Sequence, residues 1–143
     1  MSTKMTVEER EQFLADRRVG VLSIQDGERG PLTVPVWYDY ERGGTLWFLT
    51  GANSMKGQRL AKTERISLCV QTEDAPYKYV SIEGPIIERV TSDGEKHGRP
   101  MAHRYLGQEI GDAYVAGNEG GEASMLFRVQ PERWLTVDYG KQL

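Results

Sequence analysis

Apolar and polar residues alternate over several short runs of the chain, which is the pattern of β-strands that pack one face against a core. The alternation is most regular in Leu32–Tyr40 and Arg65–Gln71. Other runs rich in β-branched and aromatic residues lie between turns that contain glycine or proline; these runs are Val19–Ile24, Thr45–Thr50, Tyr77–Val90, Ser124–Val129 and Trp134–Tyr139. The pattern predicts about seven strands joined mainly as antiparallel hairpins.

Two short segments carry the signals of a helix start. Thr6 is followed three residues later by Glu9, a capping-box pattern that predicts a helix over Thr6–Asp16. After the strand predicted over residues 45–50, either Asn53 or Ser54 can cap a second helix. A strand therefore leads directly into the N-terminus of a helix.

A third helical region follows the longest predicted strand. Ser92 with Glu95 forms another capping-box pattern, and the polar helical sequence then continues, with a break expected near Gly98 and Pro100. It ends at the acidic, glycine-rich segment Gly117–Glu122, which is predicted to be a loop.

The chain length of 143 residues suits one domain, and no linker or internal repeat divides it. Gly84 and Pro85 interrupt the longest strand and predict a bulge or bend there. Many antiparallel strands with a few short helices predict a mainly β (α+β) fold, a small β-barrel spanning residues 1–143 as a single domain.

Charge and cysteine content exclude several classes of protein. Eighteen Lys and Arg residues against twenty-one Asp and Glu give a net charge of −3, which disfavours binding to nucleic acid. The single cysteine, Cys69, excludes a disulfide framework, and two histidines give no metal site, so no metal is expected. Since no run of about 18 apolar residues occurs, we expect no membrane association and a cytoplasmic protein.

The sequence contains no recognisable catalytic nucleophile. No G-x-S-x-G motif occurs, and Cys69 lies where a core residue is expected. His97 and His103 fall in the polar helical region, where a solvated side chain and a proton donor are both possible interpretations.

The segment Thr50–Lys56 is more informative. A glycine-containing turn that leads into a helix presents free N–H groups and partial positive charge, and Ser54 and Lys56 add a hydroxyl and a full charge at the same end. This arrangement is typical of a phosphate-binding site. The alternative is an ordinary capped helix with Lys56 in water.

Aromatic residues gather on the strands around this turn. Trp37, Tyr38, Tyr40 and Trp47 lie on neighbouring predicted strands, and flat rings beside a phosphate site suit a planar, phosphorylated cofactor, although aromatic barrel cores have the same composition. Pro35 cannot donate a backbone hydrogen bond, so its strand is expected at a sheet edge or beside a ligand.

In the order and spacing of its segments the chain resembles the pyridoxamine 5′-phosphate oxidase-like split β-barrel family. Within that family it resembles the actinobacterial proteins that use flavins or the deazaflavin coenzyme F420. The resemblance runs from Thr6 to Val137 and rests on RVGVLSI, GPLTVPVWYDY, GTLWFLT, NSMKGQRL, RISLCVQ, YVSIEGPI and FRVQPERWLTVD.

This resemblance implies a split antiparallel β-barrel that forms a homodimer, with cofactor grooves between the subunits. The family's phosphate-binding lysine falls on Lys56; Met55 stands where arginine is frequent, and Arg59 where asparagine is frequent. Tyr77–Tyr79 matches the strand that reaches the cofactor from the other subunit. The implied cofactor-binding residues are Val34, Pro35, Val36, Trp37, Thr50, Asn53, Ser54, Met55, Lys56, Arg59, Tyr77, Lys78 and Tyr79.

The resemblance favours a coenzyme F420-dependent reductase that transfers hydride to an unsaturated small-molecule substrate. An FMN-dependent oxidoreductase and a non-catalytic F420- or flavin-binding protein are the alternatives. The glutamate tail of the deazaflavin is anionic, and Arg59, Lys62 and Lys78 could contact it, which favours F420 over FMN. These cations could equally balance acidic side chains on a solvated surface.

Overall fold

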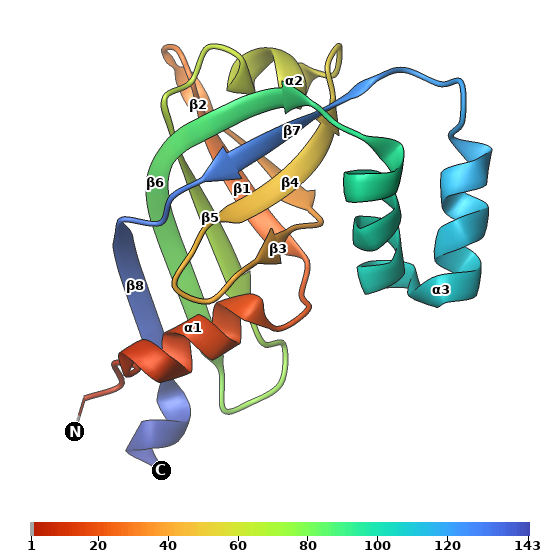
Figure 1. Ribbon diagram of the computed structural model, residues 1–143. Helices are drawn as coiled ribbons and strands as arrows, with labels where there is room; N and C mark the ends of the chain where they lie inside the picture. The colour runs from red at the N-terminus through yellow and green to blue at the C-terminus, as the bar shows by residue number, and fades with distance from the viewer. Residues whose placement is uncertain (1) are drawn as a thin grey trace.

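The computed structural model describes residues 2–143, and its antiparallel strands form an open barrel with a helical hairpin to one side (Figure 1). The elements in chain order are α1 (Val7–Ala15), β1 (Gly20–Asp26), β2 (Arg29–Val36), β3 (Asp39–Tyr40), β4 (Leu46–Gly51), α2 (Met55–Leu60), β5 (Arg65–Gln71), β6 (Lys78–Thr91), the π-helix η1 (Gly94–Gly98), α3 (Arg99–Gly117), β7 (Ser124–Val129), β8 (Arg133–Asp138) and the 3₁₀-helix η2 (Tyr139–Gln142).

The strands follow the order β2-β1-β5-β6-β7-β4-β3, and β8 pairs with the first half of β6. All pairings are antiparallel. The predicted mainly β, barrel-like fold with a few short helices is therefore confirmed. Because β2 pairs only with β1, Pro35 lies on an edge strand, as its missing N–H group requires.

The long strand β6 belongs to both halves of the barrel. Its first half pairs with β5 and β8, and its second half pairs with β7 after a register shift between Ile86 and Glu88. At Gly84 a Cβ atom would overlap the carbonyl oxygen of Gln130, so only glycine allows this close approach. The irregularity predicted at Gly84 and Pro85 lies slightly later in the chain, between Ile86 and Glu88, because Gly84 and Pro85 still pair in regular register with Ile66 and Arg65 of β5.

Helix α1 closes one end of the barrel, and the predicted capping box is present. The Thr6 hydroxyl accepts a hydrogen bond from the Glu9 N–H at 3.1 Å, and the Glu9 carboxylate accepts one from the Thr6 N–H at 2.8 Å. The helix buries Phe13 and Leu14 in a core that also contains Tyr38, Phe48, Leu68 and Ile82. Burial of these side chains is the main source of the barrel's stability.

The strand predicted over residues 32–40 divides into β2 and β3. Between them, the Tyr38 N–H donates to the Tyr105 hydroxyl at 3.0 Å. The Tyr38 carbonyl accepts from Arg104 Nε at 3.0 Å and also lies 3.0 Å from the Tyr105 hydroxyl, whose single proton has a closer acceptor in the Arg18 carbonyl at 2.6 Å. Side chains of α3 thus replace a neighbouring strand as backbone partners, which a local sequence pattern cannot indicate.

The helical region after β6 differs from the prediction in two places. Asp93, not Ser92, caps its first turn, because the Asp93 carboxylate accepts from two backbone N–H groups at 2.9 Å. The helix continues past Gly98 and Pro100, since proline is tolerated in a first turn, and it breaks instead at Gly107, where φ is +81°.

The break at Gly107 turns α3 back on itself, so that its two halves form the hairpin that stands beside the barrel in Figure 1. Asp112 in the second half accepts from His103 Nε2 at 2.6 Å and from Arg99 at 2.5 Å in the first half. These contacts hold the two halves of α3 together. No helix within residues 2–143 is long and apolar enough to span a membrane.

Candidate functional site

A cavity of about 320 Å³ lies between the edge strand β2 and the N-terminal turn of α2. Pro35, Val36 and Trp37 line it together with Lys56, although these residues are about twenty positions apart in the sequence. The rest of the lining consists of Val19, Leu49 and Tyr114. The structure thus brings together four of the residues that the family resemblance implied; Val34 is not part of the lining.

Lys56 is the cationic side chain of this cavity. It is half-buried, and burial lowers the pKa of its ammonium group. None of the ion pairs among residues 2–143 involves Lys56. A partly desolvated cation without a carboxylate partner favours an anionic ligand, because such a ligand restores the lost interaction of the charge with water.

Thr50 and Ser54 shape the turn that precedes Lys56. The Ser54 hydroxyl accepts from the Gly57 N–H at 3.0 Å and caps α2, while it donates to the Gly51 carbonyl at 2.8 Å. Thr50 Oγ1 lies 3.2 Å from Ser54 Oγ. Of the two residues predicted to cap α2, Ser54 is the one that does so. Its hydroxyl forms hydrogen bonds within the turn.

The turn also holds a carboxylate that the sequence did not reveal. The Asn53 N–H donates to Glu122 Oε1 at 2.6 Å. Glu122 belongs to the loop after α3 and is 69 residues away, so nothing local connects the two residues. Asn53 therefore offers its backbone N–H to the protein's own anion in this structure.

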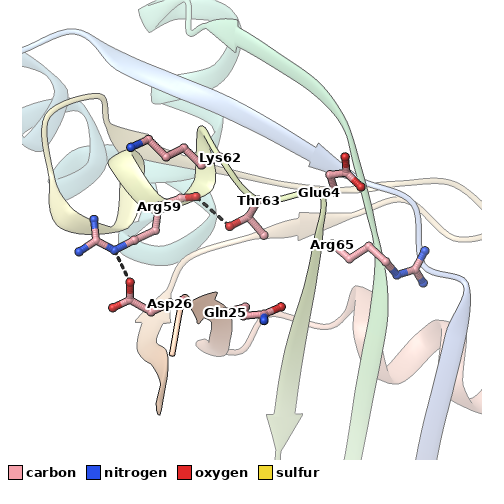
Figure 2. A pocket seen from close by; sticks show the side chains of 8 residues that line it. Gln25, Asp26, Arg59, Lys62, Thr63, Glu64 and Arg65 are labelled. Atoms are coloured by element: carbon pink, nitrogen blue, oxygen red, sulfur yellow. Dashed lines mark hydrogen bonds and ion pairs between the residues drawn. The ribbon is translucent and has the colours of Figure 1, made fainter. Parts of the chain in front are cut away.

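Arg59, also on α2, lines a separate groove of about 620 Å³ (Figure 2). Its Nε atom is 2.6 Å from Asp26 Oδ1, an ion pair that joins α2 to the end of β1. Lys62 lines the same groove, whereas Arg65 pairs with Glu83 and Glu132. Although this groove is larger than the Lys56 cavity, two of its three cations are already neutralised by carboxylates.

Tyr77, Lys78 and Tyr79 lie at the opposite end of the barrel from α2. Lys78 and Tyr79 begin β6 and pair with β8, and Lys78 Nζ is 4.0 Å from Asp138. Lys78 lines a cavity beside α1, distinct from the one that contains Lys56. Within one chain these residues do not meet Lys56, so their predicted role requires a second subunit. Met55, also predicted, is 59% exposed and lines neither cavity.

Stacked aromatic rings orient Trp37. Its indole stacks on Tyr105 with ring centroids 5.0 Å apart and 4° between the planes, and Tyr114 lies 5.6 Å away at 50°. The Tyr105 hydroxyl is itself fixed by the Arg18 carbonyl at 2.6 Å. Sequence reasoning identified Trp37 but missed Tyr105 and Tyr114, because both reach the site through the turn of the α3 hairpin.

The two histidines have structural partners. His103 contacts Asp112 at 2.6 Å, and His97 Nδ1 accepts from the Asp93 N–H at 2.9 Å. Neither histidine lines the Lys56 cavity. Residues 2–143 contain no group of three or more His, Cys, Asp or Glu side chains that could hold a metal ion.

Comparison with known proteins agrees with this architecture. The family model described as pyridoxamine 5′-phosphate oxidase matches residues 6–138. No curated protein matches the chain.

Several solved structures share the fold. A conserved hypothetical protein, Rv2991, from Mycobacterium tuberculosis is 23% identical with a TM-score of 0.79, and the match covers 99% of this chain and 89% of that one. A structure named F420 reductase is 18% identical with a TM-score of 0.61, covering 87% and 94% of the two chains. A FAD-binding protein from Mesorhizobium loti is 20% identical with a TM-score of 0.65, covering 92% and 94%.

These likenesses concern the fold, whereas the family model covers almost the whole sequence, from the cap of α1 to the end of β8. The chain therefore belongs to the pyridoxamine 5′-phosphate oxidase family.

Proposed function

We propose that the protein is a coenzyme F420-dependent reductase that passes hydride to an unsaturated small-molecule acceptor. The observation that carries the proposal is the half-buried Lys56 without an ion-pair partner, in one cavity with the Trp37 ring. A structural neighbour named F420 reductase has the same fold and supports this choice of cofactor.

The residues of the Lys56 cavity fit a phosphorylated, planar cofactor. The Lys56 ammonium group would bind the phosphate, and the backbone of Pro35 and Val36 on the edge strand would lie along the ring system. Trp37, held by Tyr105, would limit how far the ring can tilt and would keep water from one side of it. The bound reduced deazaflavin supplies the hydride, and the protein supplies binding, orientation and exclusion of water.

One cation, Lys62, supports the deazaflavin over FMN. Lys62 lies just beyond the end of α2 and lines the same groove as Arg59 (Figure 2). The anionic glutamate tail of F420 would continue past the phosphate toward this groove, where Lys62 is available.

One observation favours the FMN-dependent alternative. Arg59, expected to contact the tail, is paired with Asp26 at 2.6 Å, so less positive charge is free for a polyanionic tail than the sequence suggested. FMN has no such tail and would lose nothing from this pairing. A FAD-binding structural neighbour also shows that flavins occur on this fold.

Calorimetric titration with F420 and with FMN tests the proposal. We expect F420 to bind more tightly at low salt, with a preference that shrinks at high salt or in Lys62→Ala. Lys56→Ala should weaken either cofactor by about tenfold or more, the size of a lost charge-assisted contact, and Lys4→Ala is the matched control.

Three distinct outcomes would count against this proposal. If Lys56→Ala binds the cofactors as tightly as the native protein does, Lys56 is an ordinary solvated helix residue and does not bind phosphate. Tighter FMN binding at every salt concentration would promote the flavin-dependent alternative. Binding without turnover of any acceptor would leave a non-catalytic cofactor-binding protein.

The proposal includes a homodimer in which the partner subunit completes the cofactor groove. Val19 and Tyr114 at the cavity rim are 52% and 50% exposed, and Tyr77 is 53% exposed, so each has apolar surface for a second chain. Sedimentation equilibrium should then give twice the chain mass of 16.2 kDa. A monomer at micromolar concentration would contradict the shared groove.

A further inference from the structure

A second cavity, of about 430 Å³, adjoins the Lys56 cavity and opens beneath the η1–α3 hairpin. The two cavities share three lining residues, Trp37, Leu49 and Tyr114. Molecules bound in the two cavities would therefore be neighbours, separated by these side chains at most. In Figure 1 the hairpin stands beside the barrel and is joined to it by the end of β6 and the start of β7.

Aromatic and apolar groups form the walls of this second cavity. Trp37 is held in one plane by its stacking on Tyr105, and Tyr114 lies 5.6 Å from it at an angle of 50°. Met101 and Ala102 are buried side chains on the first half of α3 and also contribute to the lining. Such walls favour a flat molecule of one or two rings, and the ring faces attract positive charge.

The charge of the lining also favours a cationic ligand. Glu119 and Glu122 are its ionisable acidic groups, and no lysine, arginine or histidine among residues 2–143 lines it. Glu122 is engaged with the Asn53 N–H, whereas none of the hydrogen bonds or ion pairs of the described chain uses the Glu119 carboxylate. Glu119 therefore remains able to attract a cation at the rim.

We propose that this cavity binds the acceptor and selects a planar aromatic cation, with Glu119 as the residue that determines charge specificity. The identification of the occupant as the acceptor rests on the proposed function, while the preference for a ring cation rests on the lining alone. The two adjoining cavities would then divide their ligands by charge: the anionic cofactor at Lys56 and the cationic ring beside Glu119.

A ring cation also suits the chemistry of the site. Addition of a hydride with its two electrons to a carbon of an aromatic cation gives a neutral dihydro ring, so the acceptor needs no proton. The reduced cofactor is oxidised in the same step and releases its remaining proton to solvent. This balance agrees with a cavity whose lining, among residues 2–143, includes no histidine or lysine that could donate a proton.

Three probes of similar shape and different charge test the proposal: N-methylquinolinium, quinoline and quinoline-2-carboxylate. Each is titrated calorimetrically into the full chain without cofactor, at pH 8 and low ionic strength. We expect N-methylquinolinium to bind most tightly and the carboxylate at least about fivefold more weakly, because both ring faces and carboxylates repel an anion. Glu119→Gln should reduce the ratio of cation to anion affinity by about threefold, whereas Glu73→Gln, an exposed control, should not change it.

A second pair of variants tests the location of the site. Val115→Trp adds a large side chain to the lining and should abolish binding of all three probes, and Tyr114→Ala should weaken the cation most. If Val115→Trp does not fold, Tyr114→Ala still tests whether the probes lie against Tyr114, since this side chain is half exposed and its removal leaves no buried void; unchanged affinity for all three probes would overturn the location.

The outcomes separate this inference from the proposed function. Equal affinities for the three probes, tightest binding of the carboxylate, or no effect of Glu119→Gln would overturn the charge selection. Failure of F420 and FMN to bind, with the probe order as expected, would instead remove the proposed function and leave a cation site. Lys56→Ala should weaken the cofactors and leave the probes unaffected.

Discussion

Gly57, in the first turn of α2, fixes how Lys56 is presented to its cavity. A Cβ atom at Gly57 would overlap the carbonyl oxygen of Gly51 and would lie 3.1 Å from that of Ala52. Both atoms belong to the backbone of the turn and cannot move aside as a flexible side chain would. Gly57→Ala must therefore displace either the turn or the helix that carries Lys56.

The size of the effect follows from two opposing contributions. In a helix, glycine to alanine ordinarily stabilises by up to about 1 kcal/mol, because alanine loses less backbone entropy on folding. Insertion of a methyl group into a packed site costs about 1–3 kcal/mol. Gly117→Ala is the matched control, since Gly117 ends α3 and a Cβ there meets nothing within 4 Å. Because the helix gain is common to both substitutions, we expect the free energies of unfolding of the two variants to differ by about 1–3 kcal/mol, with Gly57→Ala the less stable.

Urea denaturation followed by circular dichroism measures both free energies of unfolding, and the slope with urea checks that the folded states are comparable. Gly57→Ala should also bind cofactor more weakly than Gly117→Ala, because displacement of the turn moves Lys56. If Gly57→Ala proves as stable as Gly117→Ala, the close packing of the turn against α2 is not as described, and the reasoning about Lys56 fails with it.

Two further predictions concern the buried Tyr38 hydroxyl and the half-buried Lys56 ammonium group. The Tyr38 hydroxyl is fully buried and donates to the Leu14 carbonyl at 2.7 Å, so Tyr38→Phe should lower the free energy of unfolding by about 1–2 kcal/mol in thermal denaturation; an unchanged midpoint would contradict this. Burial lowers the pKa of the Lys56 ammonium group below its ordinary value of 10.5. The folded chain therefore loses this proton at a lower pH than the unfolded chain does. Burial of the charged form costs stability at neutral pH, and the free energy of unfolding should rise as the pH increases through the lowered pKa toward 10.5. A bound phosphate needs the protonated form, so calorimetry should show cofactor affinity falling over the same pH range in the native protein and not in Lys56→Ala.

The barrel could be predicted from local sequence because each strand has its own alternation and each turn its own glycine or proline. The capping box of Thr6 and Glu9 is of this kind and occurs as expected, whereas the irregularity predicted at Gly84 and Pro85 lies slightly later, between Ile86 and Glu88. The predicted position of the helix break was wrong. The sequence does not show whether Pro100 begins a helix or interrupts one, and in the structure it lies in the first turn of α3. The break occurs at Gly107, which is marked by a positive φ that the sequence does not reveal.

The candidate site depends more on contacts between distant segments. Trp37 and Lys56 were identified from the sequence, but the stacking on Tyr105 depends on how the α3 hairpin folds against the barrel. The pairing of Arg59 with Asp26 joins residues 33 positions apart, and no local pattern distinguishes it from a cation free for a ligand. Side-chain pairing across elements is what sequence periodicity does not encode.

A crystal structure of the protein with bound F420 tests the central claim most directly, because it locates the phosphate relative to Lys56. The account predicts a phosphate oxygen within about 3 Å of Lys56 Nζ, the ring system along Pro35–Trp37, and the cavity beneath the α3 hairpin open beside it. A cofactor phosphate bound instead in the groove of Arg59 and Lys62, with Lys56 left in solvent, would contradict it.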